Sequence, residues 1–172
     1  MSEAGGPAEI LPFLLLGSFQ DSLRPKLLER LKVTHILDVK FSARRPENEK
    51  IEFLHVPLSD CGDTGLEKVL ERCCVFIDEA RNKQGGRVLV HCSLGSNRAP
   101  TVVIAYLMSR EQQTLRESYA LVCSKRSIVA VHEDYFFQLQ ELERKLRGRI
   151  SLSEAERGES VQEFIRKLRG QS

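Results

Sequence analysis

The sequence lacks the features that mark several large classes of protein. It has no tryptophan, only 6% aromatic residues and a formal net charge of +2 over 172 residues. So small a net charge argues against a nucleic-acid partner. The longest apolar run, residues 10–16, is much shorter than a membrane-spanning helix. The chain also has no secretory leader, no glycine at position 2 for myristoylation and no C-terminal prenylation cysteine, so we expect no membrane anchor.

The cysteines do not form a cross-linking or metal-binding pattern. There are five, an odd number, and no two are spaced C-x-x-C: Cys61, Cys73, Cys74, Cys92 and Cys123. This argues against a disulfide framework and against a structural zinc site. We therefore expect reduced thiols, no metal, and a location in the cytoplasm, the nucleus or both.

Hydrophobic and charged residues, 41% and 29% of the chain, are typical of one globular domain. Short apolar runs alternate with helical patterns, which predicts an α/β fold. Strands are expected at residues 13–17, 34–39, 51–58 and 87–90. Helices are expected at 22–32 with Ser22 as N-cap, after the capping boxes that begin at Thr64 and Thr114, over 102–108, and from 133 to a stop at Gly148.

The ends of the chain differ from its middle. Residues 1–8 are small and polar and are expected to be a flexible N-terminus, followed by a domain over residues 9–148. Residues 149–172 are expected to form an extension in which a third capping box, beginning at Ser160, opens a short amphipathic helix. This helix could bind a partner, dimerise or pack on the domain, and the oligomeric state stays open.

The strongest chemical signal is the segment between the strand that ends near residue 90 and the helix that follows. It reads His91-Cys92-Ser93-Leu94-Gly95-Ser96-Asn97-Arg98. A glycine-containing turn into a helix N-terminus directs several main-chain N–H groups at one point and favours a bound dianion. We expect residues 93–98 to bind a phosphate, Arg98 to grip it as a fork, and Cys92 to be an ionised nucleophile. A buried core cysteine before an ordinary turn is the alternative.

The motif resembles the H-C-x-x-G-x-x-R phosphate loop of the cysteine-dependent protein tyrosine phosphatase superfamily. The flanking segments at residues 88–90 and 105–108 resemble its atypical, small dual-specificity branch. The resemblance covers about residues 9–147 and includes the segments at residues 11–18, 34–39 and 137–139. It implies a central mixed, largely parallel sheet flanked by helices on both faces. It also implies hydrolysis of phosphotyrosine and phosphoserine or phosphothreonine through a cysteinyl-phosphate, without metal or other cofactor.

In this family an Asp about thirty residues before the Cys donates a proton to the leaving oxygen. Asp60 lies 32 residues before Cys92, just past the predicted strand at 51–58, and is expected to be the general acid. Asp63 is the rival, although its neighbour Thr64 suggests that it supports a helix N-terminus instead.

The resemblance implies a phosphoprotein substrate, such as a kinase or another signalling protein. A shallow pocket is expected because the chain has no room for the wall that tyrosine-specific enzymes build around phosphotyrosine. Four cations could contact acidic or doubly phosphorylated substrates: Arg44, Arg45, Lys125 and Arg126. Residues 144–152 resemble a basic-then-apolar kinase-docking segment.

The chain departs from the family at three places near the motif. Ala99 replaces a Ser or Thr that helps the thiolate leave, Asn97 stands where the family often has Ser, and residues 131–135 replace a P-N-x-G-F segment. Turnover is therefore expected to be slow. A low-turnover, pseudophosphatase-like module that binds phosphoproteins is the alternative, and a lipid or RNA phosphatase is a weaker third.

Overall fold

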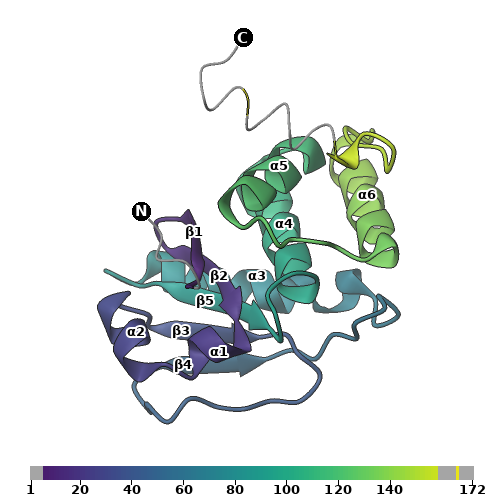
Figure 1. Ribbon diagram of the computed structural model, residues 1–172. Coiled ribbons are helices and arrows are strands. Elements are labelled where there is room, and N and C mark those ends of the chain that lie inside the picture. Colours follow the sequence, from purple (N-terminus) through teal and green to yellow (C-terminus); the bar gives the residue numbers. More distant parts are fainter. Residues whose placement is uncertain (1–5, 159–165, 167–172) are drawn as a thin grey trace.

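The computed structural model of the protein describes residues 6–158 and residue 166 (Figure 1). Five strands and six helices lie within these residues. In chain order they are β1 (Ala8–Leu11), β2 (Leu14–Ser18), α1 (Phe19–Ser22), α2 (Pro25–Arg30), β3 (His35–Asp38), β4 (Glu52–His55), α3 (Leu66–Asn82), β5 (Val88–Cys92), α4 (Arg98–Arg110), α5 (Leu115–Lys125) and α6 (Glu133–Arg147).

The strands form one mixed sheet in the order β1-β2-β5-β3-β4. Only β1 is antiparallel to its neighbour; β2, β5, β3 and β4 run parallel. A parallel sheet needs cover on both faces, because its strands are apolar on both sides. Leu14 and Leu16 face the large core under α3 to α6, whereas Leu15 packs with Leu28 of α2 on the other face. The predicted sheet, flanked by helices on both faces, is confirmed.

The sheet brings chemically useful residues to one edge. Parallel strands end on the same side, and ligands bind at these carboxyl ends. Ser18 at the end of β2 lies opposite Cys92 at the end of β5, and Asp38 at the end of β3 lies opposite His91. The chain then turns through residues 93–97 directly into α4. The motif therefore starts at the middle of the sheet.

The predicted helix at residues 22–32 is wrong in its start and its continuity. Two short helices occupy this region, and Ser22 ends the first of them instead of capping the second. The N-cap of α1 is Ser18. Its hydroxyl accepts a hydrogen bond from the Asp21 N–H, while the Asp21 carboxylate accepts one from the Ser18 N–H. Pro25 begins α2, at a position where its missing N–H costs nothing. Strand β1 is a further element that the sequence patterns do not predict.

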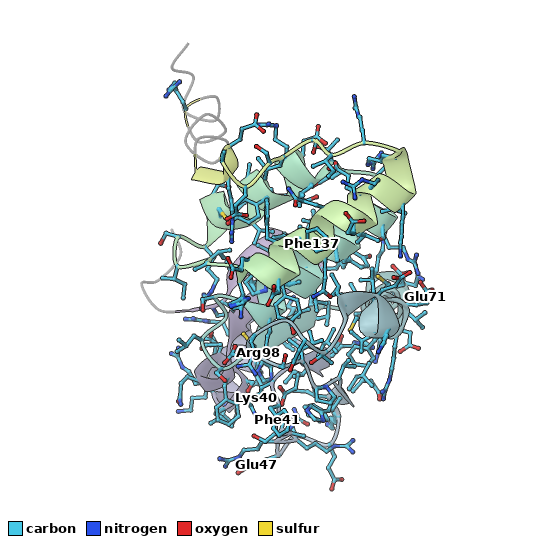
Figure 2. All side chains as sticks on the ribbon, turned by 90° about the vertical axis from the view of Figure 1, so that its right-hand side faces the viewer. Lys40, Phe41, Glu47, Glu71, Arg98 and Phe137 are labelled. Atoms are coloured by element: carbon cyan, nitrogen blue, oxygen red, sulfur yellow. The ribbon has the colours of Figure 1, made fainter. Side chains whose placement is uncertain are left out.

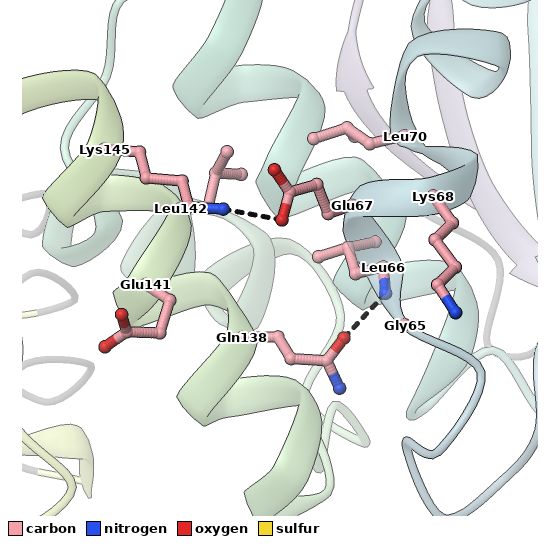
Figure 3. A pocket seen from close by; sticks show the side chains of 9 residues that line it. All are labelled: Gly65, Leu66, Glu67, Lys68, Leu70, Gln138, Glu141, Leu142 and Lys145. Atoms are coloured by element: carbon pink, nitrogen blue, oxygen red, sulfur yellow. Dashed lines mark hydrogen bonds and ion pairs between the residues drawn. The ribbon is translucent and has the colours of Figure 1, made fainter.

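The capping box at Thr64 is also wrong, whereas the one at Thr114 is confirmed. Helix α3 begins after Gly65, and the Thr64 hydroxyl instead accepts from Ser59 N–H at 2.8 Å. Gln138 of α6 accepts the hydrogen bond from Leu66 N–H at 2.6 Å, so a distant side chain replaces the cap (Figure 3). This contact lies at a groove of about 400 Å³ between α3 and α6, away from the phosphate loop.

The chain after α6 packs on the domain as far as residue 158. Gly148 ends α6 in the left-handed conformation, with φ 71°, as predicted. Leu152 is fully buried, and the Ser151 N–H and hydroxyl both donate to the buried carboxylate of Glu143 at 2.7 Å. A buried Leu152 cannot serve as the apolar anchor of a docking segment. The third capping box, at Ser160, lies outside the described residues. No helix in the described part of the chain is long and apolar enough to span a membrane.

Candidate active site

The phosphate loop requires glycine at its centre. Gly95 has φ +72°, a conformation that other residues seldom adopt. A Cβ atom there would lie 2.3 Å from the carbonyl oxygen of Gly17, at the end of β2. The loop thus packs directly against the neighbouring strand, and any side chain at position 95 would displace it.

The carbonyl groups of the loop are held from outside. Ser93 O accepts from Phe19 N–H of α1 at 3.1 Å, and Ser96 O accepts from Ala130 N–H at 2.7 Å. Between them, Leu94 O and Gly95 O each accept a 2.9 Å hydrogen bond from the guanidinium of Arg126. Four successive carbonyls are therefore fixed by three separate elements.

Arg126 lies at the end of α5 and inserts its guanidinium beneath the loop. Its Nη2 donates to Leu94 O and its Nε to Gly95 O, both at 2.9 Å. Burial lowers the pKa of Arg126, while the charges of Asp21 and Cys92 raise it. The sequence suggests Arg126 as a cation that could contact the substrate. In the structure its guanidinium instead donates hydrogen bonds to main-chain carbonyls of the phosphate loop. No local pattern reveals this, since the contacts span 31 and 32 residues.

Fixing the carbonyls also fixes the N–H groups. In a trans peptide the C=O and the following N–H point in opposite directions. The N–H groups of residues 94–97 therefore point away from the donors that hold the carbonyls. Within the described part of the chain, none of these four N–H groups donates a hydrogen bond. Unpaired donors next to a helix N-terminus form an anion site.

Arg98 and Asp60 meet beside this loop. The Arg98 side chain is only 6% exposed, and its Nε lies 2.9 Å from Asp60 Oδ1, in ion-pair contact without the angles of a good hydrogen bond. Its Nη2 donates to Ser93 Oγ at 3.0 Å and its Nη1 to Leu58 O at 3.4 Å. In the view of Figure 2, Arg98 lies between Lys40 and Phe137 of α6.

The structure separates the two acid candidates. Asp60 reaches Arg98 with a carboxylate that is 72% exposed. Asp63 instead accepts a hydrogen bond from the hydroxyl of Ser59, within its own loop. The expected role of Asp63 at the helix N-terminus is also absent from the capping of α3.

Buried charges lie behind Cys92. His91 is fully buried, with its Nδ1 3.3 Å from Cys92 O and 4.0 Å from Asp38 Oδ1. Asp38 is also fully buried and lies 3.5 Å from Lys40 Nζ. Burial lowers the pKa of His91 and outweighs the opposite effect of Asp38. The imidazole is fully buried, so solvent does not reach it.

The thiols differ in environment. All five cysteines are free, and Cys92 is 2% exposed at the start of the loop. Burial raises the pKa of Cys73 and Cys74 to about 12 and that of Cys123 to about 11. These three thiols stay protonated at neutral pH. Within the described residues, no group of three or more His, Cys, Asp or Glu side chains is placed to hold a metal ion.

The residue after Arg98 offers no hydroxyl. Ala99 is fully buried in α4. The nearby Thr101 hydroxyl donates to Asn97 O at 2.9 Å and Ser93 Oγ accepts from Arg98, so both are already hydrogen-bonded.

Comparison with known proteins agrees with this geometry. The family described as dual specificity phosphatase, catalytic domain, matches residues 14–145. Dual specificity protein phosphatase 1 of Arabidopsis thaliana is 39% identical over 140 residues, which cover 81% of this chain and 70% of that protein. Human dual specificity protein phosphatase 5 is 35% identical over 147 residues, and the match covers 84% of this chain but only 37% of that protein.

The fold agrees as well. The crystal structure of DUSP15 superposes with a TM-score of 0.74 at 30% identity, covering 87% of this chain and all of that one. The family match, residues 14–145, runs from the start of β2 into α6 and so contains the phosphate loop. The chain belongs to the dual specificity phosphatase family.

Proposed function

We propose that Cys92, Arg98 and Asp60 carry the dual-specificity phosphatase reaction in this chain. The Cys92 thiolate attacks phosphorus, the P–O bond to the substrate breaks, and Asp60 donates its proton to the departing oxygen. Arg98 and the N–H groups of residues 93–98 hold the three equatorial oxygens while charge builds on them. Water then attacks the phosphorus of the cysteinyl-phosphate and gives a proton to the Asp60 carboxylate, the S–P bond breaks, and phosphate and the thiolate are released.

One observation carries this proposal: the loop's carbonyls are turned outward by Phe19, Arg126 and Ala130 while Asp60 sits against Arg98. The arrangement supplies charge stabilisation and a proton donor at one point. It needs no metal or other cofactor for the steps above.

The substrate is a phosphoprotein, and we infer that phosphotyrosine and phosphoserine or phosphothreonine are both accepted. Leu94 of the phosphate loop is 69% exposed, so the loop lies at the surface and a short side chain can reach it. Arg44 and Arg45 line a groove of about 360 Å³ beside α2, which suits acidic segments of a kinase or another signalling protein. Five free cysteines fit a reducing compartment, the cytoplasm or the nucleus.

The assignment is tested on an aryl phosphate with the purified protein. Cys92→Ser should abolish hydrolysis, and a chelator should not change it. Asp60→Asn should lower turnover far more than Asp63→Asn when the leaving group is a poor one. Activity in Cys92→Ser, or equal losses at the two aspartates, would refute these roles.

A low-turnover module that binds phosphoproteins is the second candidate, because Ala99 brings no hydroxyl to the departing thiolate. If this slows breakdown, rapid-quench kinetics should show a burst of product equal to the enzyme concentration and then a slow rate. Ala99→Ser should raise the slow rate and leave the burst unchanged. No burst together with no gain would rule out slow breakdown.

A further inference from the structure

Asn97, the residue before Arg98, contacts two segments that are distant in the sequence. Its Nδ2 donates a 2.8 Å hydrogen bond to Asp60 O and lies 3.5 Å from Asp60 Oδ1. Its Oδ1 accepts a 2.8 Å hydrogen bond from His132 N–H. One carboxamide thus joins the phosphate loop, the loop that carries Asp60 and the segment before α6.

We propose that Asn97 is a positioning residue that holds Asp60 over the phosphate loop. The inference rests on the proposed role of Asp60 as general acid. Asn97 stands where the family often has Ser, and His132, whose N–H donates to Asn97, belongs to the second segment that differs from the family. A serine at position 97 carries its donor and acceptor on one oxygen and is too short to span these two partners.

The loop around Asp60 is tied at both ends to α6. Tyr135 Oη donates to Ser59 O at 2.7 Å, and Gln138 Nε2 donates to Gly62 O at 2.7 Å. A Cβ on Gly62 would lie 2.6 Å from that of Asp134, so the loop packs closely on the start of α6. These contacts place the loop but do not reach Asp60. In the described structure, Asp60 itself contacts Asn97 and Arg98.

Substrate binding removes one of those two contacts. One edge of the Arg98 guanidinium, formed by Nε and Nη2, faces Asp60 and Ser93. This is the edge that can bind two phosphate oxygens at once. A bound dianion competes with Asp60 for this edge and repels its carboxylate. The hydrogen bond from Asn97 goes to the main-chain oxygen of Asp60, so it does not depend on the charge of the carboxyl group. Asn97 therefore keeps the acid in place at the moment when Arg98 releases it.

The role of Asn97 is tested through the leaving group. The 4-nitrophenolate that leaves from 4-nitrophenyl phosphate is a good leaving group and needs little protonation by an acid. The phenolate that leaves from phenyl phosphate is a poorer one and needs a proton donor. In Asn97→Ser and Asn97→Ala, kcat/KM should fall about 10-fold on phenyl phosphate and less than about threefold on 4-nitrophenyl phosphate. In an Asp60→Asn background, Asn97→Ser should cause no further leaving-group-selective loss. Asn82→Ser, at the exposed end of α3, is the matched control.

The two substrates are measured on the same protein, so partial unfolding would lower both rates equally. Equal losses on both substrates, or a selective loss that persists in Asp60→Asn, would overturn the positioning role. If Asp60→Asn alone causes no selective loss, the proposed acid is wrong, which is a different failure.

Discussion

Arg126 offers a severe test of how the phosphate loop is built, because it is outside the motif and should contact no substrate. Arg126→Ala deletes the two 2.9 Å hydrogen bonds that hold Leu94 O and Gly95 O. The peptide groups that carry the N–H donors of Gly95 and Ser96 then lose their fixed orientation. Phosphate binding should suffer although every residue that surrounds the phosphate is intact.

The expected size follows from the contacts. A hydrogen bond with a charged partner contributes about 1.5–3 kcal/mol, and water can replace part of it at Leu94 O, so we expect a loss of about 2 kcal/mol in unfolding free energy. For a chain of this length that lowers Tm by about 4–8 °C. Deleting one fixed donor from an oxyanion site costs about 10²–10³ in kcat. In Arg126→Ala the N–H groups of Gly95 and Ser96 remain but are no longer held in one orientation, so we expect kcat/KM to fall about 10- to 100-fold.

The assay is kcat/KM on 4-nitrophenyl phosphate, at a temperature well below the Tm of each variant. Lys26→Ala removes a positive charge from the exposed surface of α2 and should leave the rate unchanged. Arg126→Lys keeps the charge but loses the fork, so it should behave more like the alanine variant. A rate within twofold of wild type in Arg126→Ala would refute the argument that this side chain orients the loop.

Three further predictions concern thiols, pH and the C-terminal segment. At pH 7 iodoacetamide should label Cys61 and Cys92 but not Cys73, Cys74 or Cys123, whose raised pKa values keep them protonated, and inorganic phosphate should protect only Cys92; labelling of all five in the folded protein would contradict this. Burial lowers the pKa of His91 in the folded state, so below pH about 6.5 the unfolded chain binds more protons than the folded one. Unfolding should therefore need less urea at pH 5.5 than at pH 7.5, and equal stability at the two pH values would refute this role of His91. Leu152→Ala should cost about 2–5 kcal/mol, against little for the half-exposed Leu146→Ala; equal values would show that residues 149–158 do not pack as described.

Local patterns predicted what depends on local physics. The Thr114 capping box and the Gly148 stop involve residues within one turn of each other, and both are confirmed. The strand, turn and helix of the motif follow the same logic, because the polar loop separates two apolar runs. The fold class was predictable since alternating strands and helices leave few ways to cover a parallel sheet.

The two wrong predictions are both helix caps, at Thr64 and Ser22. Thr64 has the right spacing to Glu67 for a cap, but its hydroxyl serves Ser59, while Gln138 satisfies the start of α3 from 72 residues away. Ser22 does not cap α2, because it ends α1, a helix that Ser18 caps directly after β2; α2 begins at Pro25 without a side-chain cap. At α3 a tertiary contact replaces a local cap that would contribute about 1 kcal/mol. At Ser22 the cause is local, because the capping box of Ser18 and Asp21 starts a separate helix.

The same distinction explains the candidate site. Cys92 and Arg98 are six residues apart in one motif, so the sequence alone assigns both to one loop. The contacts that orient the loop and its acid span 31 residues from Arg126 to Gly95, 37 from Asn97 to Asp60 and 35 from Asn97 to His132. A motif can name the atoms that touch a phosphate, but it cannot say which way its peptide groups turn. That direction is decided by α1, the end of α5 and the segment before α6, so substitutions there should change activity while the motif stays intact.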